Sequence, residues 1–222
     1  MRLGLPMNYR FVMIFMAIGG LFAAAPAAAH PHVFVDARAE IVFDPAGDMT
    51  GVRHIWQFDE AFSAFAIQGL DTDNDGKLSD AELAPLAKIN VESLQEYDFF
   101  TVLKVGKTRE VLTPPKEYWL DFHGGRLTLF YTLPLARPTA IGAGASVEVF
   151  DPEYFVAFTF VKQTPVKLDG APAGCNAAVR PPHELDAKTM AEMAAVPKDG
   201  SLSPELMDAA SSLASMVMVV CK

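Results

Sequence analysis

The sequence predicts an α+β protein, in which one β-rich domain carries a helix–loop–helix insertion and a helical segment near its C-terminus. Hydrophobic and polar residues alternate over residues 32–43, which is typical of a half-buried strand. A Gly-Gly pair at 124–125 joins two further alternating runs, as in a β-hairpin. Between these stretches, residues 59–97 change to a helical spacing of apolar residues around one loop.

The first 29 residues have the composition of a secretory signal peptide. Two arginines precede an apolar run over residues 11–22, and the small-residue stretch AAAPAAA after it ends at Ala29. An uncleaved membrane anchor is the alternative, but the run is shorter than the ~20 apolar residues that a bilayer requires. We therefore expect residues 30–222 to be the mature chain, to lie in the periplasm, and to contain no membrane span.

The mature chain is expected to be strongly acidic. The whole sequence has 18 Lys and Arg against 27 Asp and Glu, a formal net charge of −9. Removal of the two leader arginines leaves 16 basic against 27 acidic residues, a net charge of −11. Because such a chain repels phosphate backbones and anionic lipids, no nucleic acid is expected as a partner.

The first half of the mature chain predicts a hairpin followed by the insertion. Strands are expected over residues 32–43 and 50–58, with the turn DPAGD between them. A helix is expected over 59–70, and an S-x-x-E capping box at 79–82 starts a second helix that extends to about residue 97.

The second half of the chain returns to strand patterns and ends with helices and a last strand. Strands are expected over residues 99–105, 118–123, 126–133, 147–150, 154–161 and 216–221. Two helices are expected before the last of these strands, over residues 184–195 and 204–215.

Residues 71–82, DTDNDGKLSDAE, match an EF-hand loop at every ligand position. Such a loop supplies oxygen ligands at positions 1, 3, 5, 7, 9 and 12 and has glycine at position 6. The expected Ca²⁺ ligands are Asp71, Asp73, Asp75, the Lys77 carbonyl, Ser79 and Glu82, with Gly76 at the turn. An acidic surface loop without an ion is the alternative. Because EF-hands normally work in pairs and the sequence has one such loop, a structural role for calcium is expected rather than a switch.

A second candidate metal site lies at the expected mature N-terminus. Cleavage after Ala29 leaves a chain that begins with His30, Pro31 and His32. Imidazole suits Zn²⁺, Ni²⁺, Co²⁺ and copper better than Ca²⁺, and the terminal amine of His30 adds a further nitrogen. Pro31 has no N–H to lose, which disfavours binding through backbone nitrogens. The alternative is that the pair binds nothing. The other histidines are His54, His123 and His183, and their spacing in the sequence does not indicate which of them, if any, would be a further ligand.

The two cysteines, Cys175 and Cys221, lie downstream of the leader. In an oxidising compartment such a pair is expected to form a disulfide, with a loop-entropy contribution of about 3–4 kcal/mol. A thiolate metal site is the alternative, but the pair lacks C-x-x-C spacing.

Several segments together resemble a known bacterial family. They are HPHVFVDARAEIVF, HIWQFDEAFSAF, DTDNDGKLSDAEL, LAKINVESLQEYDFFTVL, DPEYFVAFTF and the final cysteine. The sequence resembles the domain of unknown function 1007 family over essentially the whole mature chain. The resemblance implies a periplasmic component of a nickel/cobalt-type or zinc transport system whose partner is an inner-membrane metal permease. It implies no catalytic residue.

Three functions follow as hypotheses. The first is a periplasmic accessory protein that binds Zn²⁺, Ni²⁺ or Co²⁺ through His30 and His32, with structural calcium in the loop. The second is a calcium-stabilised module that docks on a membrane permease without binding a transition metal. The third is a copper-dependent enzyme that uses the N-terminal histidine. Because the sequence has neither a G-x-S-x-G nor an H-E-x-x-H motif, we expect no enzyme.

Overall fold

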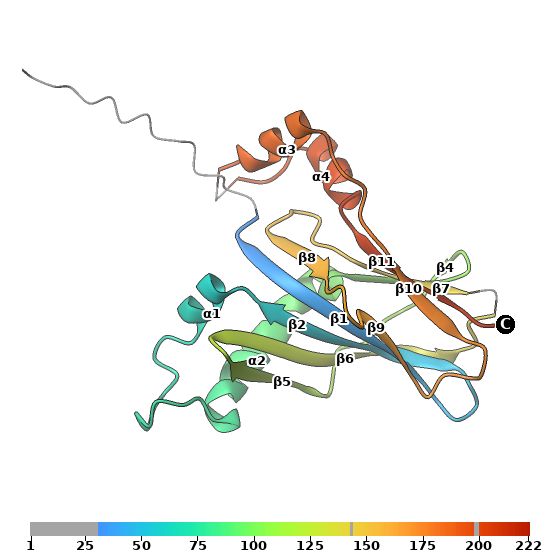
Figure 1. The fold of residues 1–222 in the computed structure, drawn as a ribbon, viewed down its shortest axis with the longest axis horizontal. Helices are drawn as coiled ribbons and strands as arrows, with labels where there is room; N and C mark the ends of the chain where they lie inside the picture. Colours follow the sequence, from blue (N-terminus) through green and yellow to red (C-terminus); the bar gives the residue numbers. More distant parts are fainter. Residues whose placement is uncertain (1–30, 143, 198–199) are drawn as a thin grey trace, which may run out of the picture.

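A computed structural model describes residues 31–142, 144–197 and 200–222. The predicted signal peptide and His30 lie outside the described residues. Within them, the chain forms two β-sheets and four α-helices, so the prediction of a β-rich mixed fold is confirmed (Figure 1). No helix in these ranges is long and apolar enough to cross a membrane.

The first sheet is built around β1 (Val33–Phe43) and β2 (Met49–Phe58), the predicted hairpin. Its strand order is β5-β6-β2-β1-β8, and β9 pairs with β1 beyond β8. The remaining strands are β5 (Tyr118–His123), β6 (Arg126–Thr139), β8 (Val156–Phe160) and β9 (Val166–Asp169). β8 and β9 run parallel to β1, whereas the other pairs are antiparallel.

The second sheet is antiparallel, with the order β10-β11-β7-β3-β4. Its strands are β3 (Thr101–Val105), β4 (Thr108–Arg109), β7 (Ala145–Val149), β10 (Asn176–Arg180) and β11 (Ser215–Val220). In β7 and β11 every second side chain is buried, so each strand presents one face to the core.

The helices fall into two groups. α1 (Glu60–Ala66) and α2 (Asp80–Leu94) follow β2, and α2 packs against β5 and continues into the 3₁₀ segment η1 (Gln95–Phe100). α3 (Ala187–Ala194) and α4 (Pro204–Ser211) pack on one another before β11, and Figure 1 shows them at a distance from α1. Met193, Leu202 and Ala210 form a small core of their own beneath this second group.

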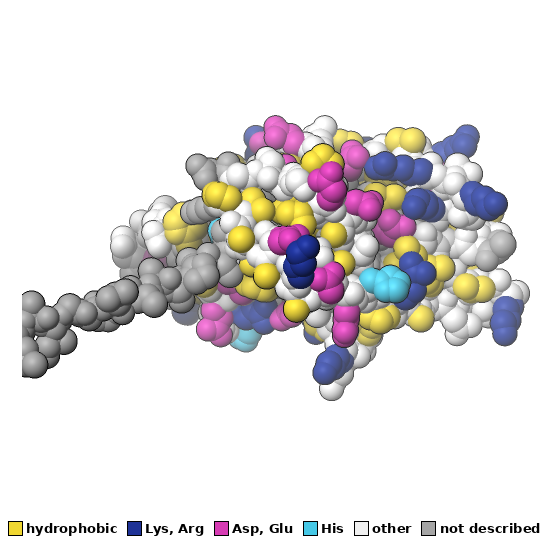
Figure 2. All heavy atoms as spheres, turned by 90° about the horizontal axis from the view of Figure 1, so that it is seen from above, with side chains coloured by type: hydrophobic (Ala, Val, Ile, Leu, Met, Phe, Trp, Pro, Cys, Tyr) yellow, Lys and Arg dark blue, Asp and Glu magenta, His cyan; other side chains and the backbone are white. Residues whose placement is uncertain are grey.

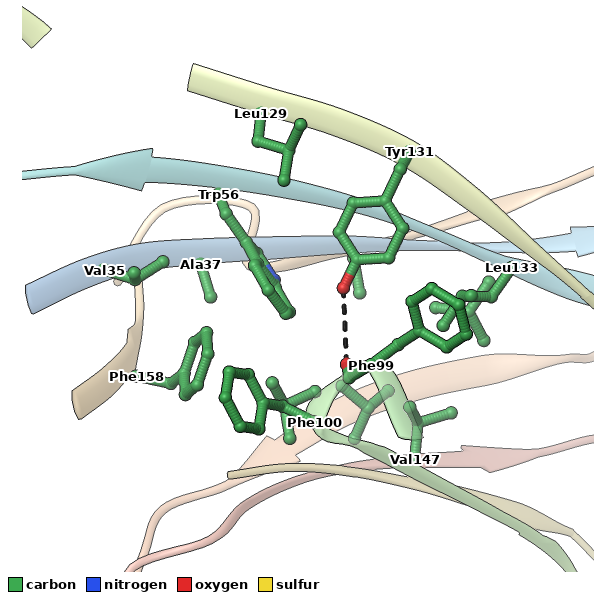
Figure 3. Packing of buried hydrophobic residues seen from close by; sticks show 14 of the residues in the cluster. Val35, Ala37, Trp56, Phe99, Phe100, Leu129, Tyr131, Leu133, Val147 and Phe158 are labelled. Atoms are coloured by element: carbon green, nitrogen blue, oxygen red, sulfur yellow. Dashed lines mark hydrogen bonds between the residues drawn. The ribbon is translucent and has the colours of Figure 1, made fainter. Parts of the chain in front are cut away.

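Large aromatic side chains fill the space between the two sheets. Trp56 from β2 lies against Tyr131 from β6 and Phe158 from β8, with ring centroids 5.0 and 4.6 Å apart (Figure 3). The ring of Phe100 lies 5.7 Å from that of Phe158, measured between centroids. Burial of each such side chain contributes about 1.5–3 kcal/mol to the stability of the fold.

Several predicted boundaries were wrong. The second helix of the insertion ends at Leu94 rather than near residue 97, and β3 begins at Thr101 rather than 99. The cause is a left-handed turn, in which Asp98, Phe99 and Phe100 have φ values of 51°, 55° and 50°. The first and last predicted helices, 59–70 and 204–215, are also shorter in the structure, and β4, β9 and β10 were not predicted.

Candidate functional site

The helix before the acidic loop is fixed to the first sheet by two polar side chains. Asp59 caps α1 by accepting a hydrogen bond from the Phe62 amide at Oδ1, and its Oδ2 accepts one from the Phe34 amide, both at 2.9 Å. The hydroxyl of Ser63 is buried and accepts a hydrogen bond from the Leu127 amide at 2.9 Å. α1 is therefore attached to both β1 and β6.

The helix after the loop begins at the predicted capping box. The Ser79 hydroxyl accepts a hydrogen bond from the Glu82 amide, and the Glu82 carboxylate accepts one from the Ser79 amide at 3.0 Å. Buried residues then follow along one side of α2: Leu83, Ala87 and Val91. Leu70 and Leu78, at the two ends of the loop, also pack against the main core. Both ends of the acidic loop are thus held in place.

Three predicted ligands converge in this loop. One carboxylate oxygen from each of Asp71, Asp73 and Glu82 lies within 4.8 Å of the other two. Ca²⁺ binds oxygens at 2.3–2.6 Å, so two ligands of one ion lie at most about 5 Å apart. In the described ranges, no other three His, Cys, Asp or Glu side chains converge in this way. The spacing and the oxygen donors both fit a hard divalent cation.

Backbone amides orient the carboxylates of the loop. Asp71 accepts hydrogen bonds from the amides of Asp75 and Gly76 at 3.2 and 3.1 Å. Asp75 lies outside the convergent set, and its carboxylate accepts from the Lys77 amide at 2.7 Å. Gly76 has φ +79°, a conformation that favours glycine, as position 6 of the motif requires.

Glu82 is the most strongly perturbed carboxylate of the loop. Hydrogen bonds from the backbone amides of Ser79 and Thr72, followed by those from their hydroxyls, lower the pKa of Glu82 to about 2. The side chain is therefore ionised at neutral pH. Each of its two oxygens accepts two of these hydrogen bonds, so a cation bound to this carboxylate would replace some of them.

The four described histidines do not lie together. His32 is half-buried at the start of β1, where its ring packs on Phe155 with centroids 4.7 Å apart. Asp36, on the same strand face, pairs instead with Arg126 at 2.9 Å. His123 and His183 are exposed, and no described histidine belongs to the convergent set.

His54 lies in the interior, away from the loop. Its side chain is fully buried between the two sheets, where burial lowers its pKa to about 3. The sequence could not predict its contact with Thr101 across the sheets, because that contact depends on tertiary packing. His54 is therefore part of the core.

The predicted disulfide between Cys175 and Cys221 is present. Cys175 directly precedes β10 and Cys221 directly follows β11, so the bond closes one end of this strand pair. An oxidising compartment is where such a bond persists.

Charges are unevenly distributed on the surface. On the face shown in Figure 2, Asp and Glu side chains lie near the middle and most Lys and Arg side chains lie toward one end. Since acidic residues outnumber basic ones over the whole chain, the net charge of the protein repels a polyanion.

Comparison with known proteins gives a family and two relatives. The family described as "Protein of unknown function (DUF1007)" matches residues 15–221. An uncharacterised protein of Haemophilus influenzae is 25% identical over 182 residues, which cover 81% of this chain and 85% of that protein. An uncharacterised 15.5 kDa protein of Spirochaeta aurantia is 29% identical over 98 residues, which cover 44% of this chain and 70% of that protein.

Proposed function

We propose that the chain, which belongs to the DUF1007 family of proteins of unknown function, is a periplasmic accessory protein of a transition-metal transport system. In this proposal the loop 71–82 binds Ca²⁺ as a structural ion. His30 and His32 bind the transported Zn²⁺, Ni²⁺ or Co²⁺, and the partner is an inner-membrane metal permease.

The observation that carries the calcium part is the convergence of Asp71, Asp73 and Glu82 between two anchored helices. Asp75, the Lys77 carbonyl and Ser79 complete the donor set of the motif. Three carboxylates this close repel one another, and a bound divalent cation would offset that repulsion. Calcium would thereby hold the end of α1 and the start of α2 in one arrangement.

The transition-metal part relies on the N-terminal sequence and on the place where it joins the fold. His32 directly precedes β1, a central strand of the first sheet, so a metal held there would be fixed to a rigid element. The disulfide between Cys175 and Cys221 supports export from the cytoplasm. Imidazole and amine nitrogens suit Zn²⁺, Ni²⁺ and Co²⁺, and a loop of carboxylates suits Ca²⁺, so the two sites would not compete for the same ion.

The test is equilibrium dialysis of the mature, chelator-stripped protein against Ca²⁺, Zn²⁺, Ni²⁺ and Co²⁺ in turn, after mass spectrometry confirms that the chain begins at His30. The double variant His30→Ala/His32→Ala should lose the transition metal and keep calcium, and Glu82→Gln should do the reverse. If neither variant changes the binding of any ion, the proposal is wrong.

A second candidate function is a calcium-stabilised module that docks on the permease without binding a transition metal. Two large apolar side chains on the helices that flank the loop favour it: Phe65 on α1 is 73% exposed and Ile89 on α2 is 59% exposed. Exposed apolar residues of this size are typical of protein contacts when they form a patch. Calcium binding alone in the dialysis experiment would support this second function.

A further inference from the structure

We infer that a cavity beside the first sheet binds a small, uncharged, apolar molecule that carries a hydrogen-bond acceptor such as a carbonyl oxygen. The cavity is separate from the loop 71–82 and does not depend on the proposed metal function. Its volume is about 260 Å³, and it lies between the helical segment α2–η1 and the inner face of the first sheet.

The walls of the cavity are mainly hydrophobic. They include Phe58 and Phe62, Leu94, Phe100, Leu129 and Phe158. Figure 3 shows Trp56, Phe100 and Phe158 turned toward one another between the sheets, so aromatic rings form the inner end of the cavity. Aromatic walls of this kind are typical of sites for small organic molecules.

Two side chains that line this cavity each carry a nitrogen atom without a hydrogen-bond acceptor in the described part of the chain. These nitrogens are Nε1 of Trp56 and Nδ2 of Asn90, and both atoms are buried. The Trp56 side chain is only 1% exposed. Buried N–H groups in folded proteins are almost always paired, and an acceptor on a bound molecule would pair these.

The charges around the cavity favour a neutral molecule. Its lining contains no Lys, Arg or His side chain that would pair with a carboxylate or phosphate. An adjoining hollow of about 400 Å³ shares Tyr97, Phe100 and Phe155 with it and is bordered by Asp151 and Glu153. Acidic neighbours and the absence of cations in this lining disfavour an anion such as a fatty acid.

One wall is made by strained backbone. Phe100, which lines the cavity, ends the run of three residues with positive φ that begins at Asp98. Left-handed backbone is unfavourable for bulky residues, and strained backbone of this kind is concentrated at active sites and ligand-binding sites. Tyr97, the residue before this run, is 45% exposed and also lines the cavity, so it marks the opening to solvent.

The size of the cavity limits the ligand. At about 260 Å³ it is slightly smaller than typical drug-sized pockets of roughly 300–1,000 Å³, so it fits one or two rings or a short acyl chain. The inferred ligand class is therefore a neutral aromatic or short-chain ketone, ester or amide.

The test uses the neutral fluorophore 6-propionyl-2-(dimethylamino)naphthalene and the same naphthalene without the propionyl group, which lacks the carbonyl acceptor. The protein is the calcium-saturated mature chain carrying Trp119→Phe, which leaves Trp56 as its only tryptophan. We expect saturable binding of the ketone at one site, with quenching of Trp56 emission, and binding of the analogue that is about fivefold to tenfold weaker.

Asn90→Leu, which removes one donor at similar volume, should weaken ketone binding by a similar factor and leave the analogue unchanged. Asn176→Leu, at an exposed position on β10, is the matched control and should change neither. Circular dichroism of each variant confirms folding. The inference is overturned if the folded protein binds neither probe saturably, or if it binds both equally and Asn90→Leu has no effect. Since calcium is saturating and no transition metal is present, neither result depends on the proposed metal function.

Discussion

Nε2 of His54 on β2 lies 3.1 Å from Oγ1 of Thr101 on β3, so a polar contact joins the two sheets inside an apolar core. The Thr101 hydroxyl also donates to the Phe99 carbonyl at 2.8 Å. Because its only hydrogen is used there, His54 must donate from Nε2, which specifies the neutral tautomer with an unprotonated Nδ1.

Burial of His54 predicts that stability depends on pH. The pKa of His54 is about 3 in the folded chain and about 6.5 in the unfolded chain, so only the unfolded chain takes up this proton between those values. The free energy of unfolding should be unaffected by His54 above pH 6.5. Below it, His54 should lower that free energy by up to about 1.4 kcal/mol per pH unit until pH 3. Urea unfolding at pH 7.5, 6.0 and 5.0 measures this slope.

His54→Leu should flatten the slope between pH 6.5 and 5.0, because it removes the group that titrates. His123→Gln, at an exposed position, is the matched control and should keep the slope of the parent. Glu82 has a lowered pKa and contributes only below about pH 4.5, outside this window. A slope that persists in His54→Leu would contradict the assignment.

Glu82→Gln should reduce the Ca²⁺ affinity of the loop by at least about tenfold, because it removes the carboxylate at position 12. Glu92→Gln on the same helix is the control. Glu92 is exposed and pairs with Lys88 at 3.4 Å, away from the loop, so calcium binding should not change. Titration calorimetry with chelator-stripped protein measures both, and equal affinities for the two variants would argue against calcium in the loop.

Gly76→Ala separates backbone strain from ion binding. Gly76 and Gly69 both have positive φ, +79° and +77°, and a Cβ on either would meet no atom within 4 Å. Each alanine variant should therefore lower the free energy of unfolding of the calcium-free protein by about 1 kcal/mol. Only Gly76→Ala should also weaken calcium binding, since Gly69 lies outside the ligand positions. Equal calcium affinities would show that the turn at Gly76 does not shape the site.

Local patterns predicted the parts of the fold that are set locally. The alternation over residues 32–43 predicted β1, and the Ser79–Glu82 spacing predicted the start of α2, because both depend on near neighbours. The left-handed turn at Asp98–Phe100 was not predictable, since packing of Phe99 and Phe100 in the core stabilises it against their intrinsic preference. β10 was missed because it lies in a stretch rich in alanine and proline, residue types depleted in strands.

The loop 71–82 could be predicted from the sequence, whereas the cavity could not. The loop motif named Asp71, Asp73 and Glu82 from spacing alone, and the structure brings them together. The cavity beside Trp56 and Asn90 left no pattern in the sequence, because its walls come from β2, α2 and other segments that are distant along the chain. Long-range packing creates such a cavity, and periodicity carries no information about it.

Removal of the disulfide should destabilise the last strand pair. Among the described strands β10 lies at the edge of its sheet and pairs only with β11, and the Cys175–Cys221 bond joins two residues that are 46 positions apart. Cys175→Ala/Cys221→Ala should lower the free energy of unfolding by about 2–4 kcal/mol and increase protease cleavage around β10. As a control, reductant added to the parent protein should lower its free energy of unfolding and increase cleavage around β10 in the same way. No change in either measurement would show that strand pairing alone holds β10.

The N-terminal histidines can be tested one at a time. His30→Ala and His32→Gln should each lower the affinity for the bound transition metal by at least about tenfold, because one imidazole is lost in each. His183→Gln, at an exposed position near α3, is the matched control. One extra serine before His30 should also weaken binding if the terminal amine is a ligand, since it moves that amine away from the ring. Visible absorption of the Co²⁺-loaded protein measures metal binding in each of the four variants. If His183→Gln alone weakens binding, the ion is held near α3 and not at the N-terminus.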